Sequence, residues 1–183
     1  MNPSEDIKSL KSGDIQKQIS ALEDLREFLL MAVAEALKAL KATNNPLLLA
    51  EKIYHFGSIA QQPLEQMFLE TSGEELKIIL AALLVQLGSK TGIQTLFNAI
   101  KNGNEYQHLA VTSLAKANIR EACPYIIETL EHLDRSFYMR RENAPFINTF
   151  LIALERLDCQ LPAHLKERFT SPDAPHDLSN FIK

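Results

Sequence analysis

The 183-residue sequence lacks tryptophan and has only two cysteines. Without an indole ring, the chain has no tryptophan anchor or stacking platform for a partner. Cys123 and Cys159 do not form a C-x-x-C motif, and both lie in apolar helical segments, so we expect two buried thiols rather than a disulfide. A chain of this length buries roughly 70% of its unfolded surface, so it needs neither a disulfide nor a structural metal to fold.

Long apolar runs and an excess of positive charge are also missing. The opening segment, MNPSEDIKSLKSGD, lacks the apolar core of a signal peptide. The longest apolar run, Ile78–Val85, is far shorter than the ~20 residues of a membrane span. We therefore expect a cytoplasmic protein with no membrane partner. The formal net charge of −4 and the pI of about 5.7 argue against a nucleic-acid partner, because nucleic-acid binders usually carry a basic stripe.

Motifs for catalysis and metal binding are absent from the sequence. None of the five histidines has the H-x-x-x-H or H-E-x-x-H spacing that places two zinc ligands on one helix face. Neither a G-x-S-x-G motif nor a Gly-rich phosphate loop occurs. We therefore predict a non-enzymatic protein with no catalytic residue, no metal and no cofactor.

Helical periodicity is what the sequence does contain. Ile15, Ile19 and Leu22 follow at three- and four-residue steps within residues 14–41, a segment without Gly or Pro, which predicts one long helix or two helices joined near Leu25. Its second half, residues 28–40, is apolar on most sides, so we expect that half to be the more deeply buried. Further helices are predicted at 46–56, 60–70, 74–87, 91–101, 105–117, 121–133, 141–157 and 162–169.

The predicted helix ends recur at a nearly constant period. Gly57, Gly88 and Asn118 follow predicted helices at intervals of 31 and 30 residues. A fixed period of this size is typical of a solenoid of helix pairs. Gly, and after it Asn, most readily adopts the left-handed backbone conformation that ends many helices. We therefore interpret these residues as helix C-caps rather than ligand loops, with a positive φ at Gly88.

A short pattern accompanies these turns and carries a family resemblance. Its three copies are Phe56-Gly57 with Ala60 and Leu64, Leu87-Gly88 with Thr91 and Leu96, and Ala117-Asn118 with Ala122 and Ile126. In this pattern the chain resembles the short HEAT-like repeats of phycobilin lyase subunits and bacterial scaffold proteins. The resemblance implies an all-α fold, an α-solenoid of about five antiparallel helix pairs.

The resemblance also implies a division of the chain. Its parts are an N-terminal helical cap at 1–45, HEAT-like repeats at 46–133, an atypical C-terminal helix pair at 134–169, and a linker with an apolar hook at 170–183. Leu80 and Ala110 stand near the positions where such repeats often carry an arginine, so we expect the array to be held by apolar contacts. The hook residues Leu178, Phe181 and Ile182 are expected to dock, either on the last repeat or on a neighbouring molecule.

Two groups of residues are candidates for binding. The first group faces away from the predicted core on successive second helices, the face with which solenoids usually bind. Its members are Gln62, Gln66, Gln94, Asn98, Lys101, Tyr125, Glu128 and His132. The second group lies in the segment DRSFYMRREN, where arginines alternate with aromatics and favour an anion or an acidic partner, unless those side chains only pair locally and fill the core. Its members are Arg135, Tyr138, Arg140 and Arg141.

Three functions are compatible with these features. The first is a protein-interaction scaffold or adaptor that binds a protein or peptide on the inner face of the solenoid. The second, implied by the family resemblance alone, is an accessory subunit of a bilin lyase-type chromophore enzyme. The third is a nucleic-acid-binding HEAT-like protein, against which the acidic pI argues.

Overall fold

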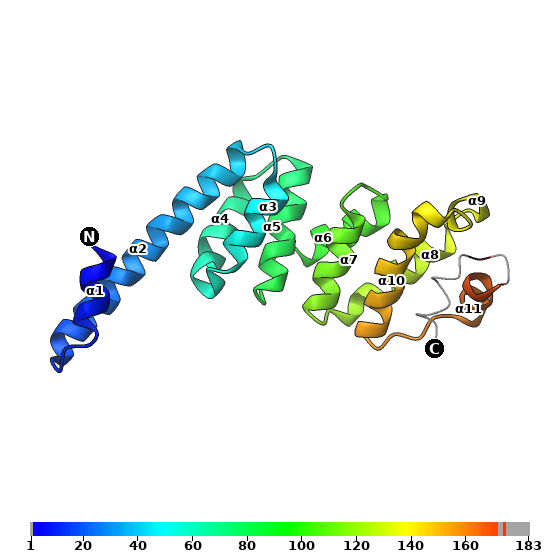
Figure 1. The fold of residues 1–183 in the computed structure, drawn as a ribbon. Helices are drawn as coiled ribbons and strands as arrows, with labels where there is room; N and C mark the ends of the chain where they lie inside the picture. The colour runs from blue at the N-terminus through cyan, green and yellow to red at the C-terminus, as the bar shows by residue number, and fades with distance from the viewer. Residues whose placement is uncertain (1, 172–173, 175–183) are drawn as a thin grey trace. The chain divides into compact units, whose positions relative to one another are not determined.

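The computed structural model describes residues 2–171 and residue 174, and every regular element in these residues is a helix (Figure 1). The prediction of an all-α fold is therefore confirmed. The elements are α1 (Pro3–Ser9), α2 (Ile15–Ala42), α3 (Pro46–Tyr54), the 3₁₀ turn η1 (Gly57–Ala60), α4 (Gln61–Glu70), α5 (Glu74–Gln86), α6 (Ile93–Asn102), α7 (Gln107–Lys116), η2 (Arg120–Ala122), α8 (Cys123–Glu131), α9 (Arg135–Tyr138), η3 (Arg141–Asn143), α10 (Ala144–Arg156) and α11 (Ala163–Thr170).

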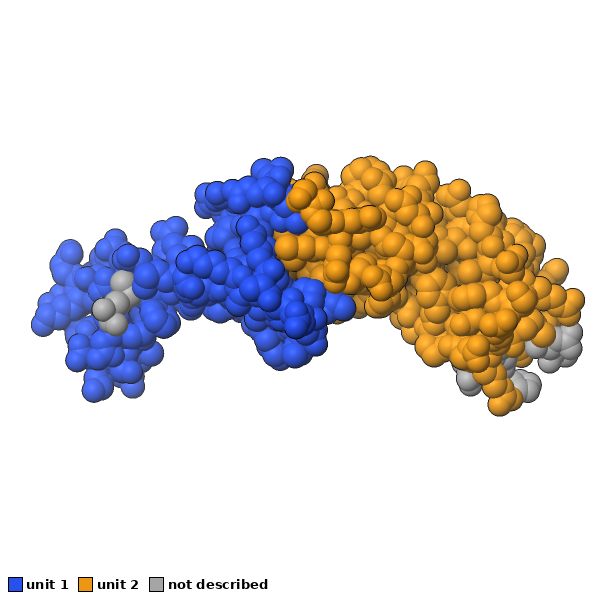
Figure 2. Space-filling model, turned by 90° about the horizontal axis from the view of Figure 1, so that it is seen from above, with its two compact units in different colours: residues 1–71 blue, residues 72–183 orange. Residues whose placement is uncertain are grey.

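The chain divides into two compact units, residues 1–71 and residues 72–183, which Figure 2 colours separately. The division falls inside the range 46–133, for which the sequence predicts a single series of repeats. The predicted ranges of cap, repeats and C-terminal pair therefore stay predictions, and each unit is described by itself.

Unit 1 is organised around the long helix α2. Asp14 caps its first turn, because its Oδ1 accepts hydrogen bonds from the backbone N–H groups of Gln16 and Lys17 at 2.9 and 3.4 Å. The α2 helix contacts α1, α3, η1 and α4. Its buried residues lie mostly in the second half, as expected: Ala21, Val33, Leu37 and Leu40.

Part of the second half of α2 is more open than its sequence suggests. Phe28, Leu30 and Met31 are 38%, 39% and 50% exposed. The second half of α2 is thus the more deeply buried one, as expected, but the start of residues 28–40 is open. The reason is that α3, η1 and α4 lie beyond it in the chain and enclose Val33, Leu37 and Leu40 instead.

The core of unit 2 forms around α5 and α7. Residues 78–85 of α5 are all at most 5% exposed, as a helix that is apolar on all sides requires. Helix α7 packs against α5, α6 and α10, and α8 packs against α6 and α10. Fully buried residues of α10 and α11, among them Phe150 and Phe169, extend the core toward the C-terminus.

The predicted helix ends are confirmed by the backbone conformation. Gly57, Gly88 and Asn118 have φ values of 62°, 88° and 56°. After α5, the N–H of Gly88 donates to the C=O of Val85 and the N–H of Ser89 donates to the C=O of Leu84, the hydrogen-bond pair of a Schellman motif. The same pair occurs at Asn118 and, in a turn without glycine, at Asp158 (φ 55°).

Gly92 is a left-handed residue of a different kind. It precedes α6 with φ of 95°, and a Cβ atom added to it would lie 2.7 Å from the Cβ and 2.8 Å from the Cα of Ala81 in α5. Gly88, by contrast, has no atom within 4 Å of an added Cβ. The absence of a side chain at Gly92 therefore permits the close approach of α6 to α5.

Polar bonds also connect the helices of unit 2. The amide Nε2 of Gln86 donates to the hydroxyl of the fully buried Ser113 at 2.9 Å. Nη1 of Arg168, in α11, lies 3.3 Å from the carbonyl oxygen of Leu130 and 3.1 Å from that of Glu131, at the end of α8. Such bonds satisfy carbonyls that a helix end leaves without an intrahelical partner. The expectation that apolar contacts hold the helices together is therefore incomplete.

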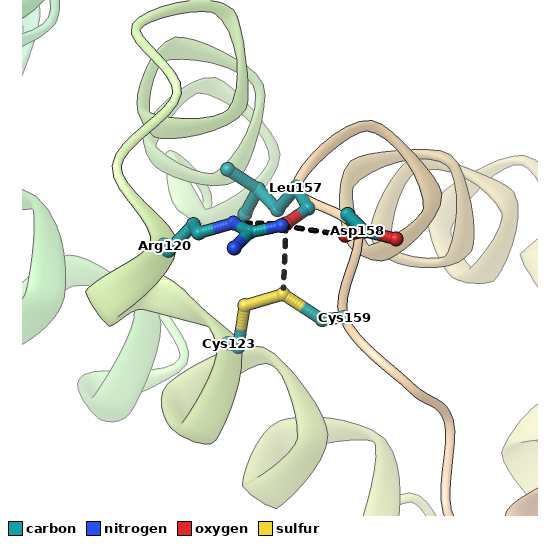
Figure 3. Close-up of a disulfide and its surroundings, with 5 residues drawn as sticks. All are labelled: Arg120, Cys123, Leu157, Asp158 and Cys159. Carbon is teal, nitrogen blue, oxygen red and sulfur yellow. Dashed lines mark hydrogen bonds and ion pairs between the residues drawn. A yellow bond between two sulfur atoms is a disulfide. The ribbon is translucent and has the colours of Figure 1, made fainter.

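The expectation of two buried thiols is wrong. Cys123, at the start of α8, and Cys159, after α10, form a disulfide, and both residues are half-buried (Figure 3). Beside it, Nε of Arg120 donates to the C=O of Leu157 at 3.0 Å, and Nη2 of Arg120 lies 2.6 Å from Oδ2 of Asp158. The Schellman turn at Asp158 brings Cys159 to α8, which is why the two cysteines meet across 36 residues.

The expected docking of the apolar hook at Leu178, Phe181 and Ile182 concerns residues that lie outside the described part of the chain. Within the described part of the chain, no helix combines the length and the apolar character needed to cross a bilayer.

Candidate binding site

An open pocket of about 450 Å³ lies in unit 2 between the ends of α6 and α8. Four of the predicted binding residues line it: Lys101, Tyr125, Glu128 and His132. They meet because α6 contributes its last turn, while α8 presents residues 125, 128 and 132 at steps of three and four along one side. The remainder of the wall includes Ile100, Gln107, Leu133 and Phe146.

Three side chains form a stack beside the pocket, and two of them, Lys101 and Tyr125, line it. The ring of Tyr125 lies on that of the buried Phe97 with 4.6 Å between the centroids and 18° between the planes. On Tyr125, Nζ of Lys101 lies 5.3 Å from the ring centroid, within the range of a cation–π contact. The stack fixes the aromatic ring in place and sets a positive charge beside it.

Glu128 and His132 provide a second polar part of the pocket wall, where the carboxylate of Glu128 has the opposite charge to Lys101. Nδ1 of His132 lies 2.7 Å from the backbone oxygen of Glu128. A carbonyl oxygen can only accept, so Nδ1 carries the proton and Nε2 is the ring nitrogen that can meet a ligand. The pocket thus combines a cation, a carboxylate, an imidazole and an aromatic face.

The part of the pocket that comes from α7 and α10 was not predicted from the sequence. Gln107 is buried, and its Nε2 donates to the C=O of Ile100, so it joins the first turn of α7 to the last turn of α6. Phe146 belongs to an aromatic group in α10, with its ring centroid 4.6 Å from that of Phe150. No sequence signal links these helices to α8, because their approach depends on tertiary packing.

The remaining members of the predicted face do not line this pocket. Gln94 and Asn98 are exposed on α6, where Nε2 of Gln94 donates to Oδ1 of Asn98 at 3.1 Å. Gln62 and Gln66 are exposed on α4, in unit 1, and Gln66 donates to Glu70 at 3.0 Å. These four residues remain predicted binding residues of an exposed surface rather than of a cavity.

The arginine-rich segment is partly engaged in packing. The ring of Tyr138 meets that of Phe169 edge-on at 5.9 Å, and the guanidinium of Arg168 lies 5.6 Å from the Tyr138 ring centroid. Nη1 of Arg140 lies 3.9 Å from Oε1 of Glu142. These contacts match the structural alternative, in which aromatics fill the core and arginines pair locally. Arg135 and Arg141 are both exposed, so anion binding by this segment stays a prediction.

A second polar cluster lies at the start of α5. The hydroxyl of Tyr106 donates to Oε1 of Glu75, and Nδ2 of Asn104 lies 3.5 Å from Oε1 of Glu74. The hydrogen bond to Glu75 raises the pKa of Tyr106 to about 12. A tyrosine whose proton is held this firmly is a structural donor at neutral pH rather than a catalytic base.

Neither geometry nor comparison assigns chemistry to these sites. Within residues 2–171, no three His, Cys, Asp or Glu side chains gather closely enough to hold a metal ion. No family model, curated protein or solved structure matches this chain. The pocket is lined by an aromatic ring, one charge of each sign and several apolar side chains.

Proposed function

We propose that the protein is an interaction module whose unit 2 binds a peptide segment of a protein partner in the pocket between α6 and α8. The observation that carries the proposal is the Phe97–Tyr125–Lys101 stack, which presents a fixed aromatic face at the edge of an open pocket. Tyrosines held in this way are frequent anchors at protein interfaces, because they contribute a large contact area at low entropic cost.

The packing order in unit 2 supports a HEAT-like arrangement. Helices α5, α7 and α10 contact one another in series, and α6 and α8 contact each other beside them. We propose that the first set forms one layer of a solenoid and the second set the layer that carries the binding face. The Schellman turns at Gly88, Asn118 and Asp158, which end the helices of the first layer, are consistent with this repeat.

The pocket wall favours a particular kind of peptide. An apolar or aromatic side chain would pack on Tyr125 and reach Phe146 and Leu133. Charged residues that flank this side chain in the peptide would bind Lys101 on one side and Glu128 and His132 on the other. The expected ligand is therefore a peptide with one apolar anchor between an acidic and a basic or amide residue.

Affinity capture with matched variants tests this proposal. The full chain and its Tyr125→Ala variant would be immobilised and exposed to an extract of the organism that encodes it, and bound proteins would be identified by mass spectrometry. A partner that is lost with Tyr125→Ala, and retained by the exposed-site control Lys90→Ala, supports the proposal. Partners retained equally by both variants would contradict it.

Two separate measurements address the alternative functions. An accessory role in bilin attachment predicts visible absorbance after co-expression with a bilin. Nucleic-acid binding predicts recovery of nucleic acid that is lost when Arg140 and Arg141 are replaced by alanine. Neither alternative has a specific contact in its favour, so the peptide-binding module is the function that we propose.

A further inference from the structure

The disulfide of unit 2 lies at the start of the helix that carries most of the predicted pocket residues. Cys123 is the first residue of α8, and Tyr125 of the pocket wall follows two positions later. Both cysteines of the chain take part in the bond, which joins α8 to the segment after α10 (Figure 3). The redox state of the two cysteines is therefore connected with the placement of Tyr125.

The two cysteines are partly open to solvent. Cys123 and Cys159 are half-buried, whereas the apolar side chains of Ile126 and Leu157 beside them are fully buried. Accessible disulfides exchange with thiols more readily than buried ones, and they include the labile and regulatory kind. A chain of 183 residues also buries enough surface to fold without a disulfide, so the fold can survive loss of the bond.

The other links at this junction are weaker than the covalent bond. Nη2 of Arg120 lies 2.6 Å from Oδ2 of Asp158, but the two side chains are 61% and 89% exposed. Ion pairs with this exposure contribute little to stability. Nε of Arg120 also donates to the C=O of Leu157 at 3.0 Å. Without the disulfide, the first turn of α8 would be held by Arg120 and by its packing on α6 and α10.

The last turn of α8 is anchored independently of the disulfide. Nη1 of Arg168 lies 3.3 Å from the carbonyl oxygen of Leu130 and 3.1 Å from that of Glu131. The side chain of Leu130 is fully buried. Loss of the disulfide should thus free the first turn and leave the last turn in place, which displaces Tyr125 more than His132.

We propose that the Cys123–Cys159 disulfide is a redox switch for the pocket between α6 and α8. The oxidised form holds the first turn of α8, so that the ring of Tyr125 lies on that of Phe97. The reduced form releases this turn. The consequence for peptide binding depends on the proposed function, whereas the release of α8 does not.

The reductant is a dithiol, and the exchange is balanced. A thiolate of the dithiol attacks one cysteine sulfur, the S–S bond breaks, and a mixed disulfide forms. The second thiol of the reductant then attacks the mixed disulfide and closes a disulfide within the reductant. Two electrons and two protons pass to the protein, so both cysteines become thiols and the dithiol is oxidised.

Hydrogen exchange of the full chain, followed by mass spectrometry, tests the release of α8. Native protein would be labelled with and without dithiothreitol, and alkylation would count the free thiols. Labelling times are kept too short for global unfolding, so that residues 78–85 of α5 stay protected in both forms. We expect two free thiols after reduction. Exchange in residues 123–128 should become about tenfold faster, because the opening is local.

The variant that lacks both sulfurs is the matched control. Cys123→Ser combined with Cys159→Ser should exchange like the reduced wild type, with and without dithiothreitol. A response of this variant to the reductant would show an effect of dithiothreitol that is unrelated to the disulfide, which would overturn the proposal.

Fluorine NMR provides a second readout, at the pocket itself. The chain has four tyrosines, and meta-fluorotyrosine gives each of them a signal. Tyr125→Phe identifies the signal of Tyr125, which the ring of Phe97 shifts in the oxidised form. Reduction should move this signal and leave that of Tyr54, in unit 1, unchanged.

Four results would overturn the proposal. They are thiols that appear only in denaturant, an unchanged exchange rate in residues 123–128, an unchanged Tyr125 signal, and a loss of protection in α5 together with α8. The last result would mean that the bond supports unit 2 as a whole. None of these measurements needs a ligand, so their failure is distinct from a failure of affinity capture to find a partner.

Discussion

Helices α2 and α5 are both rich in apolar residues, but their surroundings differ. All eight residues of the segment 78–85 in α5 are at most 5% exposed, while α2 has four buried residues in a helix of 28. Helix α5 is packed against α6 and α7, whereas the first half of α2 packs on α1 and leaves Ile15, Ile19 and Leu22 exposed. Apolar composition alone thus does not indicate which apolar side chains of a helix are covered by neighbouring helices.

The largest expected effect comes from α5. Leu80→Ala removes a fully buried side chain and should lower the free energy of unfolding of unit 2 by roughly 3–5 kcal/mol, through lost burial and the cavity left behind. Leu69→Ala, at a position that is 76% exposed, should change stability by no more than about 0.5 kcal/mol. Urea denaturation followed by circular dichroism measures both. If the two variants lost the same free energy of unfolding, the cost of removing a leucine side chain would not depend on its burial, which would contradict the prediction.

The second prediction concerns the disulfide, which is a further source of stability in unit 2. It closes a separation of 36 residues, for which the loss of chain entropy in the unfolded state corresponds to about 3–4 kcal/mol. Cys123→Ser should therefore lower the denaturation midpoint of unit 2, and a reducing agent should lower that of the wild type to a similar extent. The variant itself should not respond to the reducing agent. A wild-type midpoint that is insensitive to reduction would contradict the prediction.

The two left-handed glycines on either side of the α5–α6 turn form a finer comparison. Gly88→Ala should cost about 1–2 kcal/mol, which is the price of a Cβ in the left-handed region, and Gly88→Val should cost more. Gly92→Ala adds the close approach to Ala81 and should cost roughly 1–3 kcal/mol beyond that value. The quantity to compare is the difference in unfolding free energy between the two alanine variants. A value near zero would show that α6 can move away from α5 freely.

The smallest expected effect depends on pH. Because the hydrogen bond to Glu75 raises the pKa of Tyr106 to about 12, from an ordinary value near 10, the tyrosine stabilises the fold fully below pH 10. This contribution should disappear as the pH rises from 10 to 12. Tyr106→Phe removes the ionisable hydroxyl, so wild type and variant should differ in stability at pH 9 and converge near pH 12. A constant difference across this range would argue against the bond.

Much of the fold could be predicted from local signals. Periodicity predicted the helices from α2 to α8, and glycine or asparagine marked their ends at 57, 88 and 118. The helix α9 and the turn η3 were not foreseen, since the segment around Tyr138 has too few residues for a periodic pattern. Asp158 forms the same turn after α10, although aspartate adopts the left-handed conformation less readily than glycine.

Four residues of the candidate site were predictable because helix spacing sets them on the predicted face: Lys101 of α6 and three residues along α8. Tyr125, Glu128 and His132 share a side of α8 by spacing alone, so the sequence placed them together. Gln107 and Phe146 reach the pocket from other helices, and the disulfide joins segments far apart in the chain. Contacts of this kind depend on how the helices pack against one another, and no local sequence pattern indicates that packing.

The contact between Gly92 and Ala81 has a consequence for recognising other members of this fold. A methyl group is already too large at position 92, and a larger residue at position 81 would fill the same space. Chains that share this α5–α6 packing should therefore hold glycine at the first position and alanine or glycine at the second, whatever else has diverged around them. Two small residues eleven positions apart, with the glycine at the start of the second helix, form a signature that sequence comparison can look for.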